Sequence, residues 1–142
     1  MKKRATTRPA KRSKLTIGDV MTPRPITLGT KVSLLTAHRT MNESRLRHVP
    51  VVERGKLVGV ITQRDLYFLE SIEGVDMEKD CVEDAMSADT YTVSPSAPLA
   101  RVVGTMARKR YGCAVVMEKG KVTGIFTTTD ALKMLAGLAR AS

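Results

Sequence analysis

The sequence is poor in the residue types that cross-link small proteins or stack on nucleic-acid bases. It has no Trp, two Phe, three Tyr and two Cys among its 142 residues. Cys81 and Cys113 show no spacing typical of metal or thiol-redox sites, and Cys113 is expected to be a buried, inert thiol. No apolar run approaches the ~20 residues that span a bilayer, and no secretory signal is recognisable. These absences predict a soluble, cytoplasmic protein without a metal site.

Acidic residues are absent before Asp19, whereas seven of the first 14 residues are basic. This segment therefore supplies +7 of the net charge of +10. It is polar, without hydrophobic periodicity and interrupted by Pro9, so residues 1–14 are expected to form a disordered tail. Such a tail is either a solvated arm or an electrostatic tether for nucleic acid or an acidic partner. It has no aromatic side chain that could stack on bases.

What the sequence does contain is an internal repeat. Its markers, each separated from its counterpart by 65 positions, are Gly59 and Gly124, Thr62 and Thr127, and Asp65 and Asp130. A strict period of this length indicates two copies of one supersecondary unit. Two units this small usually share a core, because either alone would bury little apolar surface. The predicted domains are residues 15–73 and 81–142, joined by a linker over 74–80.

Each copy shows the pattern strand, helix, strand, strand, helix, which predicts an α/β (α+β) fold. In the first copy the expected elements are a strand over 26–28, a helix over 32–42, a hairpin of His48–Glu53 and Lys56–Thr62, and a helix from 63 to about 72. In the second copy, Ser96 is the expected N-cap of the first helix, whose apolar face includes Leu99 and Met106. Its last helix is expected from 128 to about 139.

The most informative motif is a threonine that ends a strand, followed three residues later by an aspartate. It occurs as Thr62–Asp65 and again as Thr127–Asp130. This spacing is typical of a capping box, worth about 1 kcal/mol. The free N–H groups at a helix start also favour an anion, and a carboxylate there can bind a sugar diol. The motif is therefore either a cap or a site for a ribose that carries a phosphate.

The order of the motifs resembles a tandem pair of cystathionine-β-synthase (CBS) domains, also called a Bateman module. The first copy carries the resemblance in Val20-Met21-Thr22-Pro23, His48-Val49-Pro50-Val51-Val52 and Gly59-Val60-Ile61-Thr62 with Asp65. The second carries it in Ala85-Met86-Ser87, Ala114-Val115-Val116 and Gly124-Ile125-Phe126-Thr127 with Asp130. Together these motifs extend over nearly all of residues 17–138.

The resemblance implies a regulatory binding module rather than an enzyme, with no obligatory cofactor. Members of the family hold adenosine nucleotides or related ligands, such as AMP, ATP, S-adenosylmethionine or NAD, in clefts between the repeats. The family's ribose-binding carboxylate falls on Asp65 and Asp130, and its hydroxyl on Thr62 and Thr127. The base would lie against residues of the first strand and the hairpin, namely Ile26, Thr27, Val49 and Pro50, and Tyr91, Thr92, Ala114 and Val115.

The copies differ where the phosphates would lie. The first has Arg47, His48 and Arg64, which supply positive charge, and arginine suits bidentate phosphate contacts. The second has Gly112, Cys113 and Thr129 at those positions, which offer at most neutral donors. Arg47 is either a phosphate ligand or a solvated cation, and His48 either a ligand or a structural residue. Tyr111 either stacks on the base or belongs to the core.

Three functions are compatible with these observations, of which the third is a pure interaction module with degenerate pockets. The first is a non-catalytic, ligand-sensing CBS pair that binds an adenosine-type nucleotide. The second is a nucleic-acid-associated protein in which the basic tail binds and the CBS pair is a scaffold or dimerisation module. The resemblance also implies a homodimer through apolar helical surface, expected at Leu34–Met41, Leu99–Met106, Leu132, Leu135 and Leu138. No membrane partner is expected.

Overall fold

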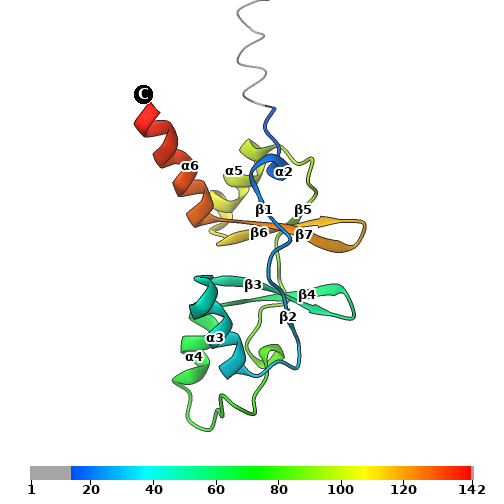
Figure 1. Cartoon of the computed structure of the whole chain (residues 1–142), viewed down its shortest axis with the longest axis vertical. Coiled ribbons are helices and arrows are strands. Elements are labelled where there is room, and N and C mark those ends of the chain that lie inside the picture. The colour runs from blue at the N-terminus through cyan, green and yellow to red at the C-terminus, as the bar shows by residue number, and fades with distance from the viewer. Residues whose placement is uncertain (1–13, 142) are drawn as a thin grey trace, which may run out of the picture. The chain divides into compact units, whose positions relative to one another are not determined.

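The chain is built from two compact units, described one at a time (Figure 1). The computed structural model describes residues 14–141, so all of the predicted tail 1–14 except Lys14, and any tether that it provides, lies outside the described residues. We call the units the four-stranded unit, residues 14–23, 91–118 and 123–141, and the three-stranded unit, residues 24–90 and 119–122. Within the described range, no helix is both long and apolar enough to cross a membrane.

The three-stranded unit has a sheet of order β2-β3-β4, with β2 parallel and β4 antiparallel to the central strand. Helices α3 and α4 lie on one face of this sheet (Figure 1). The elements are β2 (Leu28–Gly29), α3 (Leu34–Ser44), β3 (His48–Glu53), β4 (Lys56–Thr62), α4 (Gln63–Glu70) and the short 3-10 helix η1 (Val82–Asp84). The core joins Leu34, Ala37 and Met41 of α3 to residues of β3, β4 and α4.

The four-stranded unit repeats this plan with one additional strand, in the order β1-β7-β6-β5. Its elements are α2 (Ile17–Val20), β1 (Thr22–Pro23), β5 (Thr92–Val93), α5 (Leu99–Lys109), β6 (Cys113–Glu118), β7 (Lys121–Thr127) and α6 (Thr128–Ala141). Val102 and Met106 of α5 pack in its core with Phe126 of β7, and Ala131 and Met134 of α6 pack against this cluster. The expected fold class of two repeated α/β units is confirmed.

Each copy of the repeat contributes its opening segment to the sheet of the other copy. Strand β1, from the start of the first copy, pairs antiparallel with β7 of the second. At the same offset, Ser87 from the start of the second copy bridges to Val60 of β4 through two backbone hydrogen bonds of 2.9 Å. Ile17 is accordingly buried in the core of the four-stranded unit, and Val82 in that of the three-stranded unit. The structural units are therefore composed of interleaved sequence segments.

Both hairpins lie where the sequence predicts them. The strands of the first hairpin are His48–Glu53 and Lys56–Thr62. Those of the second, 65 residues later, are Cys113–Glu118 and Lys121–Thr127. Arg54 and Gly55 have φ values of 53° and 80°, and Lys119 and Gly120 have values of 53° and 76°. Two successive residues with positive φ are typical of the turn that joins twisted strands through a two-residue loop.

The expected strand over 26–28 is wrong at its start, because β2 covers only Leu28–Gly29. The cause lies across the sheet, where Pro50 of β3 has no N–H to donate to β2. In the second copy, Val115 stands at the position of Pro50, and its N–H donates to the carbonyl of Tyr91 (2.9 Å). The corresponding strand β5 therefore begins one residue earlier in the repeat, at Thr92.

Two local expectations about helix ends are also corrected. Ser96 does not cap α5, whose N-cap is Pro98, because the Ser96 hydroxyl lies 3.2 Å from the Ser94 hydroxyl instead. Helix α4 ends at Glu70 rather than near residue 72. Its end is fixed by Ser71, whose hydroxyl donates to the Phe68 carbonyl (2.7 Å).

The apolar faces of α3 and α5, which were expected to meet a partner, instead pack in the cores of their own units. Leu34, Ala37 and Met41 are at most 1% exposed, and Val102 and Met106 at most 3%. Their helical spacing signals burial, and the sheet of their own unit supplies it. By contrast, the terminal helix α6 leaves its leucines 60–67% exposed: Leu132, Leu135 and Leu138.

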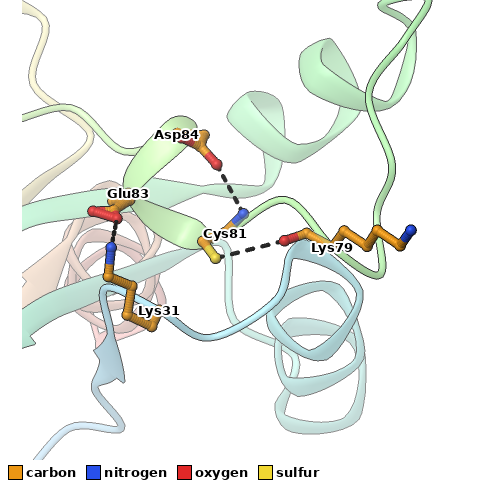
Figure 2. Close-up of polar contacts among 5 residues, drawn as sticks. All are labelled: Lys31, Lys79, Cys81, Glu83 and Asp84. Atoms are coloured by element: carbon orange, nitrogen blue, oxygen red, sulfur yellow. Dashed lines mark hydrogen bonds and ion pairs between the residues drawn. The ribbon is translucent and has the colours of Figure 1, made fainter.

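Helix η1 is held to the loop after β2, as Figure 2 shows for its side chains. The Lys31 ammonium pairs with the Glu83 carboxylate, and the Asp84 carboxylate accepts from the Cys81 N–H (2.9 Å). The Cys81 thiol is 3.7 Å from the Lys79 carbonyl. Lys31 is 79% exposed, so its ion pair contributes little to stability. The backbone bond from Val82 N–H to the Val32 carbonyl (2.8 Å) is the firmer attachment.

Candidate functional site

The first candidate site lies where β4 ends and α4 begins. Thr62 is the N-cap of α4, and its hydroxyl accepts from the Asp65 N–H (3.1 Å). The Asp65 Oδ2 atom in turn accepts from the Thr62 N–H (2.9 Å). These two bonds satisfy two of the N–H groups that a helix start leaves free. The capping-box alternative is therefore confirmed as the local structure of this motif.

The second copy reproduces this geometry at the junction of β7 and α6. The Thr127 hydroxyl accepts from the Asp130 N–H (3.1 Å), and Asp130 Oδ2 accepts from the Thr127 N–H (2.9 Å). The same spacing occurs a third time, at Thr16 and Asp19. There, Asp19 Oδ2 accepts from the Thr16 N–H (2.9 Å) at the start of α2. In all three of these described instances the aspartate accepts from the N–H of the threonine three residues earlier.

Capping occupies only one oxygen of each carboxylate. Among the described residues, no protein donor reaches Oδ1 of Asp65 or of Asp130. Both aspartates are partly exposed, so the second oxygen is available to a ligand while the first holds the helix start. Cap and ligand site are therefore compatible functions of the same side chain.

The predicted phosphate-binding positions of the first copy gather at this helix start. The Gln63 N–H donates to the Arg47 carbonyl (3.0 Å), and His48 pairs with Thr62 across the hairpin. Arg64 occupies the first turn of α4 and is exposed, as is Arg47. We call this group the Asp65 site: Arg47, His48, Thr62, Arg64 and Asp65.

The second copy gathers its counterparts in the same way. The Thr128 N–H donates to the Gly112 carbonyl (3.0 Å), which places Cys113 beside the start of α6. We call this group the Asp130 site: Gly112, Cys113, Thr127, Thr129 and Asp130. It contains no basic side chain at these positions, so its one formal charge is that of Asp130.

Burial shifts the pKa of one group in each site, His48 in the Asp65 site and Cys113 in the Asp130 site. Burial lowers the pKa of His48 from its ordinary value of 6.5, the neighbouring Arg47 lowers it further, and Asp65 partly opposes both. The direction of this shift favours the neutral imidazole, whereas the expectation was that His48 supplies positive charge. Burial raises the pKa of the Cys113 thiol to about 11. The expectation that the Cys113 thiol is buried is confirmed.

The residues expected to line a base fall into two groups. Val49 and Ala114 are fully buried in the cores of their units, so their side chains support the hairpins from the helix side. In and just before the edge strands, Ile26, Thr27 and Thr92 are exposed and Tyr91 is partly buried. On the neighbouring interior strands, Pro50 of β3 and Val115 of β6 are buried. The rings of Tyr91 and Tyr111 lie 5.1 Å apart and both pack against the core.

The sequence analysis did not identify the role of two methionines beside the hairpins. A Cβ atom on Gly59 would lie 2.8 Å from the Met86 Sδ atom, and one on Gly124 would lie 2.9 Å from the Met21 Cγ atom. Each glycine thus gives room to a methionine from the opening segment of the other copy. The shared 65-residue offset of both pairs was the available signal.

The described residues contain no group of three or more His, Cys, Asp or Glu side chains arranged to hold a metal ion. Both sites offer hydroxyl and carboxylate groups; the Asp65 site adds two guanidinium groups and an imidazole, and the Asp130 site adds a thiol. Such groups suit a ligand that presents a sugar diol, and the arginines suit one that also carries negative charge.

Comparison with known proteins places this geometry in a family. A model of the CBS domain matches residues 17–70 and 82–137. Among curated proteins, L-aspartate semialdehyde sulfurtransferase of Methanocaldococcus jannaschii is 28% identical over 136 residues, which cover 94% of this chain. The match spans 26% of that protein, 24% of a homoserine O-acetyltransferase and 14% of an A-adding tRNA nucleotidyltransferase. The chain thus spans about a quarter, or less, of these relatives.

The matches to solved structures cover a larger share of the matched chains than the matches to curated proteins do. A protein named AcuB from Vibrio cholerae has a TM-score of 0.80 and 30% identity, covering 88% of this chain and 93% of that one. The CBS domain pair of protein MJ0100, solved with 5′-methylthioadenosine and S-adenosyl-L-methionine, has a TM-score of 0.77 and 25% identity. That match covers 86% of this chain and 96% of the other. With the family model matching both repeats, this chain belongs to the CBS domain family and contains a tandem pair of CBS domains.

Proposed function

We propose that this chain is a non-catalytic regulatory module that binds an adenosine-type nucleotide at the Asp65 and Asp130 sites. In each site the ribose hydroxyls donate to the aspartate Oδ1 atom. The observation that carries the proposal is the free carboxylate oxygen beside a capped helix start, present in both copies. The adenosine ligands named for the MJ0100 pair support the choice of nucleoside.

The two sites differ in the ligand charge they favour. Arg47 and Arg64 give the Asp65 site two permanent positive charges, and charge-assisted hydrogen bonds are roughly twice as strong as neutral ones. The Asp130 site has Gly112 and Thr129 at those positions. The Asp65 site therefore takes the more phosphorylated ligand, such as ATP or AMP. A nucleoside with an uncharged or cationic 5′ group suits the Asp130 site.

The decisive test is Asp65→Asn, because the asparagine oxygen can still accept from the Thr62 N–H and keep the cap. We expect a fold of near wild-type stability and a loss of AMP or ATP affinity of about tenfold or more, since a ribose hydroxyl loses an ionised acceptor. Calorimetric titration with AMP, ADP, ATP, 5′-methylthioadenosine and S-adenosylmethionine measures both sites. Asp130→Asn tests the Asp130 site in the same way.

The chain offers a matched control in Asp19→Asn. Asp19 makes the same bond to a threonine N–H at α2, but it belongs to neither the Asp65 site nor the Asp130 site. This variant is expected to bind nucleotides as the wild type does. Equal affinity of wild type and Asp65→Asn, or no binding by the wild type at millimolar nucleotide, would refute the proposal.

A further inference from the structure

Helix α5 begins with an arginine where the other described helices carry an acidic or neutral residue. Arg101 is the third residue of α5, after the N-cap Pro98. At this position the other helices have Asp or Thr, such as Asp65 in α4 and Thr36 in α3. The positive end of the helix dipole lies at the N-terminus, so a cation there is unfavourable. The stability of the helix therefore does not explain Arg101.

A second arginine lies on the same side of α5, two turns later. Arg101 and Arg108 are seven residues apart, which places them about 20° apart around the helix axis and about 10 Å apart along it. Both are exposed, and they point away from the face that buries Val102 and Met106. Between them, Thr105 accepts a hydrogen bond from the Arg108 guanidinium (3.5 Å). The two arginines thus form one stripe on the solvent side of the helix.

No acidic side chain of α5 balances this charge. The helix has no Asp or Glu, and it ends with two further exposed cations. Among the residues that the structure describes, none of these basic side chains forms an ion pair. In the first copy, Thr36 and Glu43 of α3 stand at the positions of the two arginines, so the charge belongs to the second copy alone. We call this group the α5 basic face: Arg101, Arg108, Lys109 and Arg110.

The basic N-terminal segment joins the folded chain at the start of the same helix. The Leu15 carbonyl accepts from the Leu99 N–H (2.9 Å), and Thr16 bridges to Pro98. Lys14 is exposed, and the sequence before it has six basic residues and no acidic one. The segment is therefore attached beside the α5 basic face, where its charge adds to that of the helix.

We propose that the α5 basic face binds the phosphate backbone of double-helical nucleic acid. Guanidinium groups form paired hydrogen bonds with phosphate oxygens. Beside the arginines, Gly104 leaves open space above the helix, since a Cβ atom there would meet nothing within 4 Å. Phosphate contacts supply affinity without reading the bases, so binding is independent of sequence. This function is separate from nucleotide binding at the Asp65 and Asp130 sites.

Other polyanions suit this face less well. A helix that lies on a membrane surface buries large apolar side chains, and protein interfaces rely on aromatic anchors such as Trp and Tyr. Apart from its basic residues, the solvent side of α5 has only Ala, Gly and Thr. It also has no aromatic side chain on which an unpaired base could stack, which favours a duplex over a single strand.

The test compares two double variants that lose the same charge. Arg101→Gln with Arg108→Gln removes two cations of the α5 basic face. The matched control, Arg39→Gln with Lys56→Gln, removes two exposed cations of the three-stranded unit. All four side chains are exposed, and glutamine is about as good a helix former as arginine. Both full-length variants should therefore fold as the wild type does, which thermal unfolding checks.

Fluorescence anisotropy with a labelled DNA duplex of about 20 base pairs, at several salt concentrations, gives the affinity and its salt dependence. Each phosphate contact adds about 0.9 to the slope of log affinity against log salt concentration. We expect the α5 variant to bind about tenfold or more weakly at about 0.1 M salt, with a slope smaller by about 1.8. The control variant should keep the wild-type slope.

A wild-type slope in the α5 variant would overturn the inference, because the N-terminal segment alone would then account for the binding. An equal loss in both variants would overturn it as well, since net charge rather than this face would be responsible. Tighter binding of polyglutamate than of the duplex would assign the face to an acidic protein instead. The α5 variant should bind AMP as the wild type does, so a failure of AMP binding in both overturns the proposed function alone.

Discussion

Replacing Gly59 by alanine tests how tightly the exchanged opening segment packs on its hairpin. A Cβ atom at Gly59 would lie 2.7 Å from the Ser87 carbonyl oxygen and 2.8 Å from the Met86 Sδ atom. The carbonyl cannot move freely, because it accepts from the Val60 N–H at 2.9 Å. The added methyl group must therefore displace the bridge between Ser87 and Val60.

The magnitude follows from these contacts. Overpacking a well-packed site costs typically about 1–3 kcal/mol, and the two bonds of the bridge are each worth about 1 kcal/mol. We expect Gly59→Ala to lose about 2–3 kcal/mol of unfolding free energy. At Gly124 the obstructing atoms all belong to the Met21 side chain. Methionine adapts readily, so Gly124→Ala should lose less, about 1 kcal/mol.

Urea unfolding of the full chain measures both effects, and Gly104→Ala is the matched control. Gly104 lies within α5, and a Cβ atom there would meet nothing within 4 Å. Because alanine is the better helix former by about 1 kcal/mol, this control should be as stable as the wild type or more stable. Gly59→Ala with the stability of Gly104→Ala would refute the packing argument, as would a larger loss at Gly124 than at Gly59.

Two further predictions concern charge and assembly. Because burial lowers the pKa of His48 below 6.5, the unfolded chain takes up its proton first. The wild type should therefore lose stability relative to His48→Gln as the pH falls below 6.5, measured by urea unfolding between about pH 8 and about pH 5; parallel pH profiles would contradict this. Homodimerisation through α6 stays a prediction. Leu132→Lys with Leu135→Lys should give a folded monomer by light scattering at micromolar concentration, since both leucines are at least 60% exposed; an unchanged mass would contradict this interface.

The hairpins could be predicted to the residue because their signals are local. Runs rich in β-branched residues on either side of Arg54-Gly55 indicate both strands and the turn between them. The start of β2 could not be predicted in this way, since it depends on a missing donor on Pro50, across the sheet. The faces of α3 and α5 were assigned to a partner because helical periodicity shows which face is buried but not what buries it.

The exchange of opening segments between the copies could not be predicted from the sequence, for a different reason. Under a strict repeat, Met21 pairs equally well with Gly59 in its own copy or with Gly124 in the other. The sequence pattern is the same whether each methionine packs on the glycine of its own copy or of the other copy. The structure shows the exchanged pairs, Met21 with Gly124 and Met86 with Gly59. At the candidate sites, the threonine–aspartate motif was located correctly. Whether it caps a helix or binds a ribose could not be decided, because one carboxylate has an oxygen for each.

The interleaved order of segments also determines when each unit can form during synthesis. Apart from residues 119–122, the three-stranded unit is one continuous stretch from 24 to 90, so it can fold as soon as that stretch leaves the ribosome. Ile17 and β1 are made earlier, yet their partners in α5, β6 and β7 are made last. Closing so long an interval is slow compared with local contacts. Until then, Ile17 and Val20 have no core to enter and are available to chaperones.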